Sequence, residues 1–231
     1  MAIAFDAAAG GNNGGAGGNY DFTGLTVGSG SDRWLLVGVT HTSVVNNVTA
    51  VTWDQGGTNQ AMTKIGSDQL GVSRYHQMWS LKAPTSGNKT LRVTQSGGDY
   101  ILVAAAAYTG VDNTGSVNPE ASAQNTADPT PISLSVTTLT DNAWLVMTAS
   151  GESGTTVAST GMTKRAGDGF GGDICIIGDS GGAKSPTGSY SIEASCASGN
   201  MAGHVVSLAP AAGGGGGGVV GAPFFRQVAG F

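Results

Sequence analysis

Ser180, His41 and Asp99 have side chains that together could form a nucleophilic catalytic triad. Ser180 lies in the segment 178–182, which reads Gly-Asp-Ser-Gly-Gly, and the histidine and the aspartate precede it in the chain. In such a triad the serine hydroxyl attacks a carbonyl carbon, the imidazole takes the hydroxyl proton, and the aspartate orients the imidazole. The sequence therefore offers a nucleophile, a general base and an orienting acid.

The segment around Ser180 matches the nucleophile motif of chymotrypsin-like serine proteases, and the chain order and length agree with that family. The match is incomplete, because the proline that normally follows this motif is absent, as are the alanine pair and the cysteine that usually flank the histidine. Gly, Asp and Ser are also typical turn residues. Segment 176–186 aligns with segment 78–84, which has the pattern of a strand end and its turn. We therefore expect a turn, no catalytic residue and no enzyme.

Other residues that could bind a metal or act on sugars lack the required spacing. Three glutamates occur, and none pairs with an aspartate as the two carboxylates of a glycosidase do. Asp168 and Asp173 flank a glycine-rich run without the alternating acidic pattern of a calcium loop. His76 and His204 lie in apparent strands, with no second His or Cys at ligand spacing. We expect no metal and no cofactor.

The two cysteines, Cys175 and Cys196, lie on either side of a turn around Ser185. An antiparallel hairpin at this turn would bring the two thiols face to face and permit a disulfide. Synthesis in a reducing cytoplasm would oppose the bond. Both alternatives stay open at this point.

Short alternating or β-branched runs, separated by Gly, Asn, Asp and Pro, recur along the chain and predict strands. The predicted strands cover residues 33–39, 48–53, 75–81, 90–93, 100–103, 132–136, 143–147, 174–177, 190–194 and 204–208. Charged residues make up only 11% of the chain, which disfavours long amphipathic helices. We predict an all-β protein, an antiparallel β-sandwich that is either jelly-roll-like or a pair of Ig-like units.

Two landmarks recur in the same order and indicate an internal duplication. Segments 33–36 and 143–146 share Trp-Leu, and segments 61–64 and 161–164 share Met-Thr-Lys. We place the first β repeat at residues 1–112 and the second at residues 113–210, either as two domains or as one joint sandwich.

The first repeat holds about ten extra residues between these landmarks, and they include Trp53. Insertions in repeats usually form loops, and loops carry binding specificity. Trp53 and Tyr75 are therefore candidate platforms for stacking a glycan. The alternative is a longer hairpin with a core tryptophan, because large aromatic side chains usually lie inside.

The strand pattern stops after Pro210. Residues 211–218 end in six consecutive glycines and predict a flexible linker. Residues 219–231 follow. Their apolar residues are too few to form a hydrophobic core of their own. We predict that this segment is an assembly tail that binds a partner through four residues: Phe224, Phe225, Arg226 and Phe231. Docking of the tail onto its own sandwich is the alternative.

Charge and hydropathy disfavour two classes of partner. The formal net charge is −5 without a basic cluster, so we expect no nucleic acid ligand. No apolar run approaches the ~20 residues that cross a bilayer, so we expect no membrane span. Residues 1–6 lack the charged start and apolar core of a secretory signal, and we expect synthesis in the cytoplasm.

The sequence resembles a Gly/Thr-rich β-sandwich module found in phage virion proteins and in large bacterial surface proteins. The residues that carry the likeness are 2–6, 33–39, 78–84 and 108–112. The resemblance implies a display or coat role, and it brings no catalytic or binding residues with it.

With no secretion signal and a single tethered module, we expect a virion protein made in the host cytoplasm, of the capsid decoration, cement, spike or fibre type. The expected partners are other virion proteins, such as major capsid or tail proteins, and further copies of the chain. The alternative is a carbohydrate-binding or adhesive module at a cell surface, with a host surface glycan as ligand.

Overall fold

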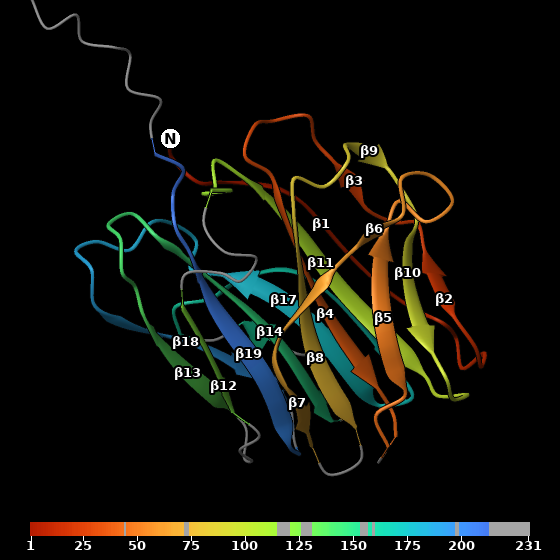
Figure 1. Ribbon diagram of the computed structural model, residues 1–231. Helices are drawn as coiled ribbons and strands as arrows, with labels where there is room; N and C mark the ends of the chain where they lie inside the picture. Colours follow the sequence, from red (N-terminus) through yellow and green to blue (C-terminus); the bar gives the residue numbers. More distant parts are fainter. Residues whose placement is uncertain are drawn as a thin grey trace, which may run out of the picture.

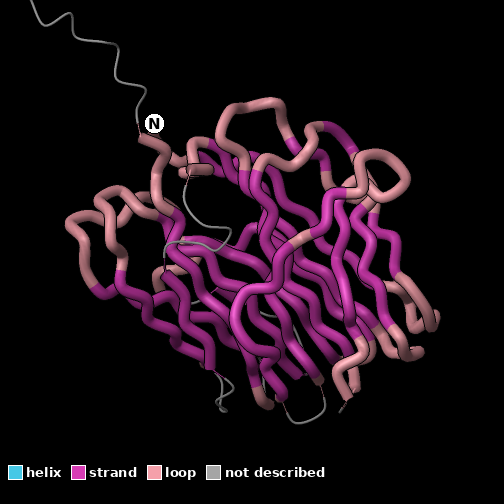
Figure 2. Tube along the Cα trace, in the orientation of Figure 1, coloured by secondary structure: helices cyan, strands magenta, loops and turns pink. Residues whose placement is uncertain are grey.

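The computed structural model describes residues 1–43, 45–71, 74–114, 121–125, 131–152, 157–158, 160–196 and 199–212. Within these ranges the backbone forms strands, turns and loops, and no helix that could cross a membrane is present. Figure 2 shows that the strands make up the body of the molecule and that the loops lie at its ends. The prediction of an all-β sandwich is confirmed.

The first half of the chain forms two antiparallel sheets. The five-stranded sheet has the order β1 (Ala4–Asn12), β11 (Ile101–Thr109), β4 (Trp34–His41), β8 (Tyr75–Lys82) and β7 (Thr63–Leu70). The four-stranded sheet has the order β2 (Tyr20–Phe22), β10 (Leu91–Gln95), β5 (Val48–Trp53) and β6 (Gln60–Ala61). A short pair, β3 (Thr26–Val27) with β9 (Gly87–Asn88), lies beside them.

The second half also forms two antiparallel sheets. Its five-stranded sheet has the order β12 (Ala121–Asn125), β19 (Met201–Leu208), β14 (Trp144–Glu152), β17 (Asp173–Asp179) and β16 (Thr163–Phe170). Its three-stranded sheet has the order β13 (Ile132–Thr137), β18 (Ser189–Ser195) and β15 (Val157–Ala158).

The two halves have the same strand order. In each five-stranded sheet the first strand of the half pairs with its last strand, and the middle strand, β4 or β14, begins at Trp34 or Trp144. The recurring methionines, Met62 and Met162, are both buried and directly precede the edge strands β7 and β16. Among the described residues β6 has no strand counterpart in the second half, and it directly precedes Met62, at the end of the stretch in which the first half holds its extra residues.

The four sheets stack as layers, with both five-stranded sheets in the middle and a smaller sheet on each outer side (Figure 1). Three hydrophobic cores separate the layers. Successive side chains of β4 point to opposite faces of the sheet and so enter two different cores. Leu35 and Val37 belong to the outer core of the first half. Trp34 and Leu36 belong to the central core. Because both faces of β4 are covered, the whole strand is buried.

Small residues let the layers approach each other closely. The β11 run of four alanines at 104–107 is fully buried between two cores. In β1, a Cβ on Gly11 would lie 2.6 Å from the Tyr20 hydroxyl oxygen and 2.8 Å from the Phe22 ring, so a larger residue there would force these side chains to move. In β4, a Cβ on Gly38 would lie 2.9 Å from Cβ of Thr148 in the second half. The central sheets therefore pack through glycine and alanine as well as through large side chains.

The ends of the two halves are joined by backbone pairing. Val111 and Pro210 form a bridge, the amide of Asp112 donates to the Ala209 carbonyl over 2.9 Å, and the amide of Ala211 donates to Gly110 over 2.8 Å. The predicted seam after Asp112 falls largely on residues 115–120, which lie outside the described residues.

Candidate functional site

A buried polar cluster around Asp179 joins the two halves. Asp179 ends β17, and its side chain is 0% exposed. Its carboxylate accepts two hydrogen bonds from Arg165 on β16, over 2.7 and 3.0 Å, and one from the Tyr108 hydroxyl on β11 over 3.0 Å. Arg165 also lies over the ring of Phe5 on β1, 4.3 Å from the ring centroid. The Asp179 carboxylate is therefore bonded to residues of both five-stranded sheets.

The surroundings of this cluster shift two pKa values. Burial, reinforced by the Asp179 charge and its hydrogen bond, raises the pKa of the Tyr108 phenol well above its ordinary value. The hydrogen bond to Asp179 raises the pKa of Arg165. Both groups therefore keep their protons, and the cluster acts as a fixed ion pair with a hydroxyl donor.

The motif that contains Ser180 forms the end of β17 and a turn. The carboxylate of Asp179 accepts the Gly181 amide over 2.8 Å. The hydroxyl of Ser180 donates to the Gly182 carbonyl over 2.6 Å and accepts the Leu145 amide over 3.2 Å. Both side chains of the motif are thus engaged in local structure.

The three candidate triad residues do not meet. Asp179, next to Ser180, contacts Tyr108, which pairs with Trp34 at the start of β4. His41 lies at the other end of that strand, about 23 Å away at roughly 3.3 Å per residue. Only His41 and Asp99 approach each other, with 3.9 Å between Nδ1 and Oδ2. The serine therefore has no histidine base.

Replacing Ser180 with alanine should lower the free energy of unfolding by about 1 kcal/mol, because two hydrogen bonds of one partly exposed hydroxyl are lost. Chemical denaturation measures this change. We also expect no labelling of Ser180 by a fluorophosphonate probe. Labelling that disappears in a His41→Ala variant would show an activated serine instead.

The other two histidines face each other between the central sheets. His76 on β8 shares hydrogen bonds with Thr40 through Nδ1 and with Thr148 of the second half through Nε2, each over 3.0 Å. The His204 ring on β19 lies 5.6 Å from the His76 ring, centroid to centroid. All four side chains are buried. This pair, which the sequence pattern assigned to ordinary strand positions, is a polar contact between the halves.

Burial lowers the pKa of all three histidines. It is the largest cause for His76, whose pKa lies well below the ordinary value, and for His204, whose pKa falls to about 4. Burial also lowers the pKa of His41, although the charge of Asp99 opposes the shift. At neutral pH the histidines are therefore uncharged, which suits the hydrogen bonds of His76 to the Thr40 and Thr148 hydroxyls in a buried interface.

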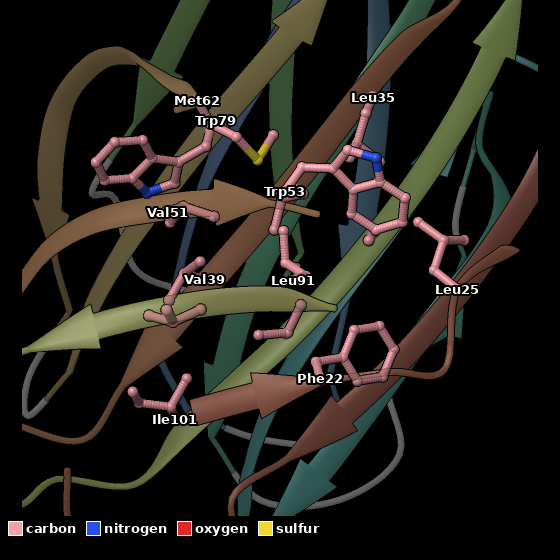
Figure 3. Close-up of a cluster of buried hydrophobic side chains, with 14 of the residues drawn as sticks. Phe22, Leu25, Leu35, Val39, Val51, Trp53, Met62, Trp79, Leu91 and Ile101 are labelled. Carbon is pink, nitrogen blue, oxygen red and sulfur yellow. The ribbon is translucent and has the colours of Figure 1, made fainter. Parts of the chain in front are cut away.

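Trp53 belongs to the core and cannot serve as an exposed glycan platform. Its side chain is 0% exposed, packs among apolar residues (Figure 3), and donates from Nε1 to the Thr85 carbonyl over 2.9 Å. The extra residues after it form a turn on Asp54, whose carboxylate accepts the Thr58 amide and hydroxyl. Tyr75 is half-buried and stacks on His41 at 5.3 Å between ring centroids. Trp53 is therefore a core tryptophan, which is the alternative to a glycan platform given above.

The hairpin expected to bring the two cysteines together does not form. β17, which carries Cys175, pairs with β14 and β16, whereas β18, which precedes Cys196, pairs with β13 and β15 in another sheet. Cys175 lies in the central core and Cys196 in the outer core of the second half. The two sulfur atoms form no disulfide.

Asp173 is engaged by a cation from the first half. Arg74 makes ion pairs with Asp173 over 2.5 Å and with Glu152 over 3.0 Å. Burial raises the pKa of Asp173, while Arg74 acts in the opposite direction. In the part of the chain that the structure describes, no three His, Cys, Asp or Glu side chains gather where they could hold a metal ion.

One apolar groove of about 900 Å³ opens where the chain ends meet. The residues that line it are Met1, Ala2, Ile3, Thr140, Asn142, Trp144, Ala183, Pro210, Ala211 and Ala212. The amino group of Met1 donates to the Ala211 carbonyl, which holds the first strand segment against the last. The four tail residues proposed to bind a partner, Phe224, Phe225, Arg226 and Phe231, lie outside the described residues.

Sequence reasoning missed both inter-sheet clusters and the groove, because their members come from both halves of the chain. A usable signal was present for Asp179, since an aspartate two residues after the predicted apolar strand 174–177 needs a partner if it is buried. Comparison with known proteins adds no assignment, since no family model, no curated protein and no solved structure matches this chain.

Proposed function

We propose that this chain is a non-enzymatic structural protein of a virus particle, a capsid decoration or cement protein or a spike or fibre protein on the particle surface. The observation that supports this proposal is that the buried polar side chains make structural contacts between the two halves. Asp179, Arg165, His76 and Arg74 are engaged in contacts between the two halves, and neither His41 nor Asp99 reaches Ser180. These groups stabilise a rigid stack of sheets, which is what a coat protein requires.

In this proposal the tail attaches the stack to the particle. Residues 219–231 carry three phenylalanines and one arginine behind six glycines. A buried phenylalanine contributes about 1.5–3 kcal/mol, so a few aromatic contacts suffice for a stable anchor. The partners are other virion proteins and neighbouring copies of the chain.

The test is the location of the protein in purified particles and its dependence on the tail. Deleting residues 213–231 should leave the melting temperature almost unchanged, because the buried residues that form the three cores of the described part of the chain lie between Ile3 and Leu208. The same deletion should abolish incorporation, measured by mass spectrometry of purified particles. Normal incorporation of the shortened chain would refute the role of the tail, and absence of the full chain from particles would refute the virion role.

The carbohydrate-binding alternative loses its main support with the burial of Trp53. A coat protein without a receptor role should bind nothing on a glycan array. Reproducible binding to one glycan class would instead favour an adhesive module.

We also infer that the two halves are copies of one ancestral unit. The identical strand order of the five-stranded sheets and the placement of Trp34 and Trp144 at the start of their middle strands support this inference.

A further inference from the structure

The groove beside Trp144 has the size and lining of a binding site for an apolar segment. Its volume of about 900 Å³ lies within the range of pockets that hold small ligands. Most lining residues are apolar, and Thr140 and Asn142 supply polar groups at the edge. No described segment of the chain fills it.

Two exposed apolar side chains lie at this groove or next in the chain to a residue that lines it. Met1, which lines it, is 58% exposed, and Leu139, next to the lining residue Thr140, is 65% exposed. They are two of the most exposed large apolar side chains of the described residues. A peptide bound inside the groove would leave Leu139 exposed to solvent. A second folded protein would cover the groove and these exposed side chains together.

The glycine linker begins at the rim of this groove, because Ala211 and Ala212 line it and Gly213 follows. Six glycines span about 13 Å on average, taking roughly 5–6 Å times the square root of the residue number. When two copies face each other groove to groove, each linker starts beside the groove of the other copy. The linker is then long enough to cross without being stretched.

We propose that the groove of one copy binds residues 219–231 of a second copy, and that the two copies exchange tails reciprocally. Such an exchange is isologous, so the same surface serves on both chains and the dimer closes on itself. The proposal rests on the proposed structural role, because a particle holds copies of its proteins at high local concentration.

The aromatic content of the tail supplies enough contact area for a dimer. A phenylalanine buries about 150–250 Å². If Phe224 and Phe225 dock in each groove, the four rings bury roughly 600–1,000 Å² on the tail side alone. Together with the groove walls this exceeds the ~1,000 Å² total expected of a specific interface. Docking of the tail into its own groove would leave Met1 and Leu139 exposed, whereas exchange between two facing copies covers these side chains together with the groove.

Sedimentation velocity of the full chain over a range of concentrations tests the exchange. The wild-type chain should dimerise as its concentration rises. Ala183→Arg, which places a large cation on an exposed lining residue, should weaken dimerisation at least about tenfold. The matched control is Ala61→Arg, an exposed alanine on β6 in the outer sheet, which should dimerise like wild type.

A mixing experiment separates exchange from other modes of association. The triple variant Phe224→Ser/Phe225→Ser/Phe231→Ser keeps its groove and lacks the aromatic side chains of the tail, whereas Ala183→Arg keeps its tail and lacks a working groove. At a concentration where each variant alone is largely monomeric, an equimolar mixture should form more dimer than either variant, through one intact tail in one intact groove. This heterodimer should be weaker than the wild-type dimer, because only one of the two contacts forms. Heterodimers are detected with a fluorescent label on one of the two variants.

Three results would overturn the proposal: a wild-type chain that stays monomeric at all concentrations, variants that dimerise like wild type, or a mixture that stays monomeric. The first would point to docking of the tail into its own groove. These outcomes are independent of the particle location, since a dimer that is missing from particles would refute the virion role and leave the exchange intact.

Discussion

Replacing Asp179 with alanine should destabilise the protein by about 3–5 kcal/mol, the usual cost of removing one partner of a buried ion pair. The substitution leaves the Tyr108 hydroxyl in a dry core without its acceptor, and leaves Arg165 without its counterion. It also removes the acceptor of the Gly181 amide. Urea denaturation followed by tryptophan fluorescence gives the change in the free energy of unfolding.

The surface pair of Asp21 and Arg92 offers a matched control. Arg92 likewise donates two hydrogen bonds to the Asp21 carboxylate, both over 2.6 Å. The Asp21 side chain is 44% exposed, however, whereas Asp179 is buried. Water and salt screen such a pair, so Asp21→Ala should change stability little. Equal losses for the two substitutions would contradict the view that burial gives Asp179 its importance.

Acid should weaken the protein by about 3 kcal/mol between pH 7 and pH 4 through His204 alone. Burial lowers the folded-state pKa of this side chain to about 4, below the ~6.5 of the unfolded chain. The unfolded state therefore binds the proton first as the pH falls. The contribution of His204 is complete above pH ~6.5, declines as the pH falls from ~6.5 towards 4, and changes no further below that. His76 acts in the same direction.

The comparison of wild type with His204→Gln isolates this effect. The carboxylates that also titrate below pH 5 are common to both proteins, so they cancel in the difference between the two stability curves. In the variant the slope of unfolding free energy against pH should be smaller by roughly 1 kcal/mol per pH unit near pH 5. Parallel curves for the two proteins would show that the pKa of His204 is the same in the folded and the unfolded state.

The sequence predicts the interior strands well and the edge strands poorly. All ten predicted strands are present, because their apolar and β-branched residues are buried on one or both faces. β7 and β16 escaped prediction because they carry Lys, Asp and Gly among few apolar residues. Both are edges of five-stranded sheets, where charged and small residues discourage pairing with further strands.

The sequence pattern does not predict which distant strands pair or which sheets stack on each other. The cysteine hairpin fails because the chain crosses from one sheet to another between β17 and β18, and a local pattern of apolar residues is the same whether it turns back or crosses over. Asp179 and Tyr108 are 71 residues apart. Their contact depends on how two complete sheets are stacked.

The central core has a consequence for how such a chain could have arisen. A single half would expose one face of its five-stranded sheet, including Trp34 and Leu36 in the first half or Val146 and Val206 in the second. An apolar face of that size drives association in water. If both halves descend from one ancestral unit that carried the same apolar face, we infer that two copies of that unit associated through it. Fusion of two gene copies would then have turned an encounter that depends on concentration into an intramolecular one.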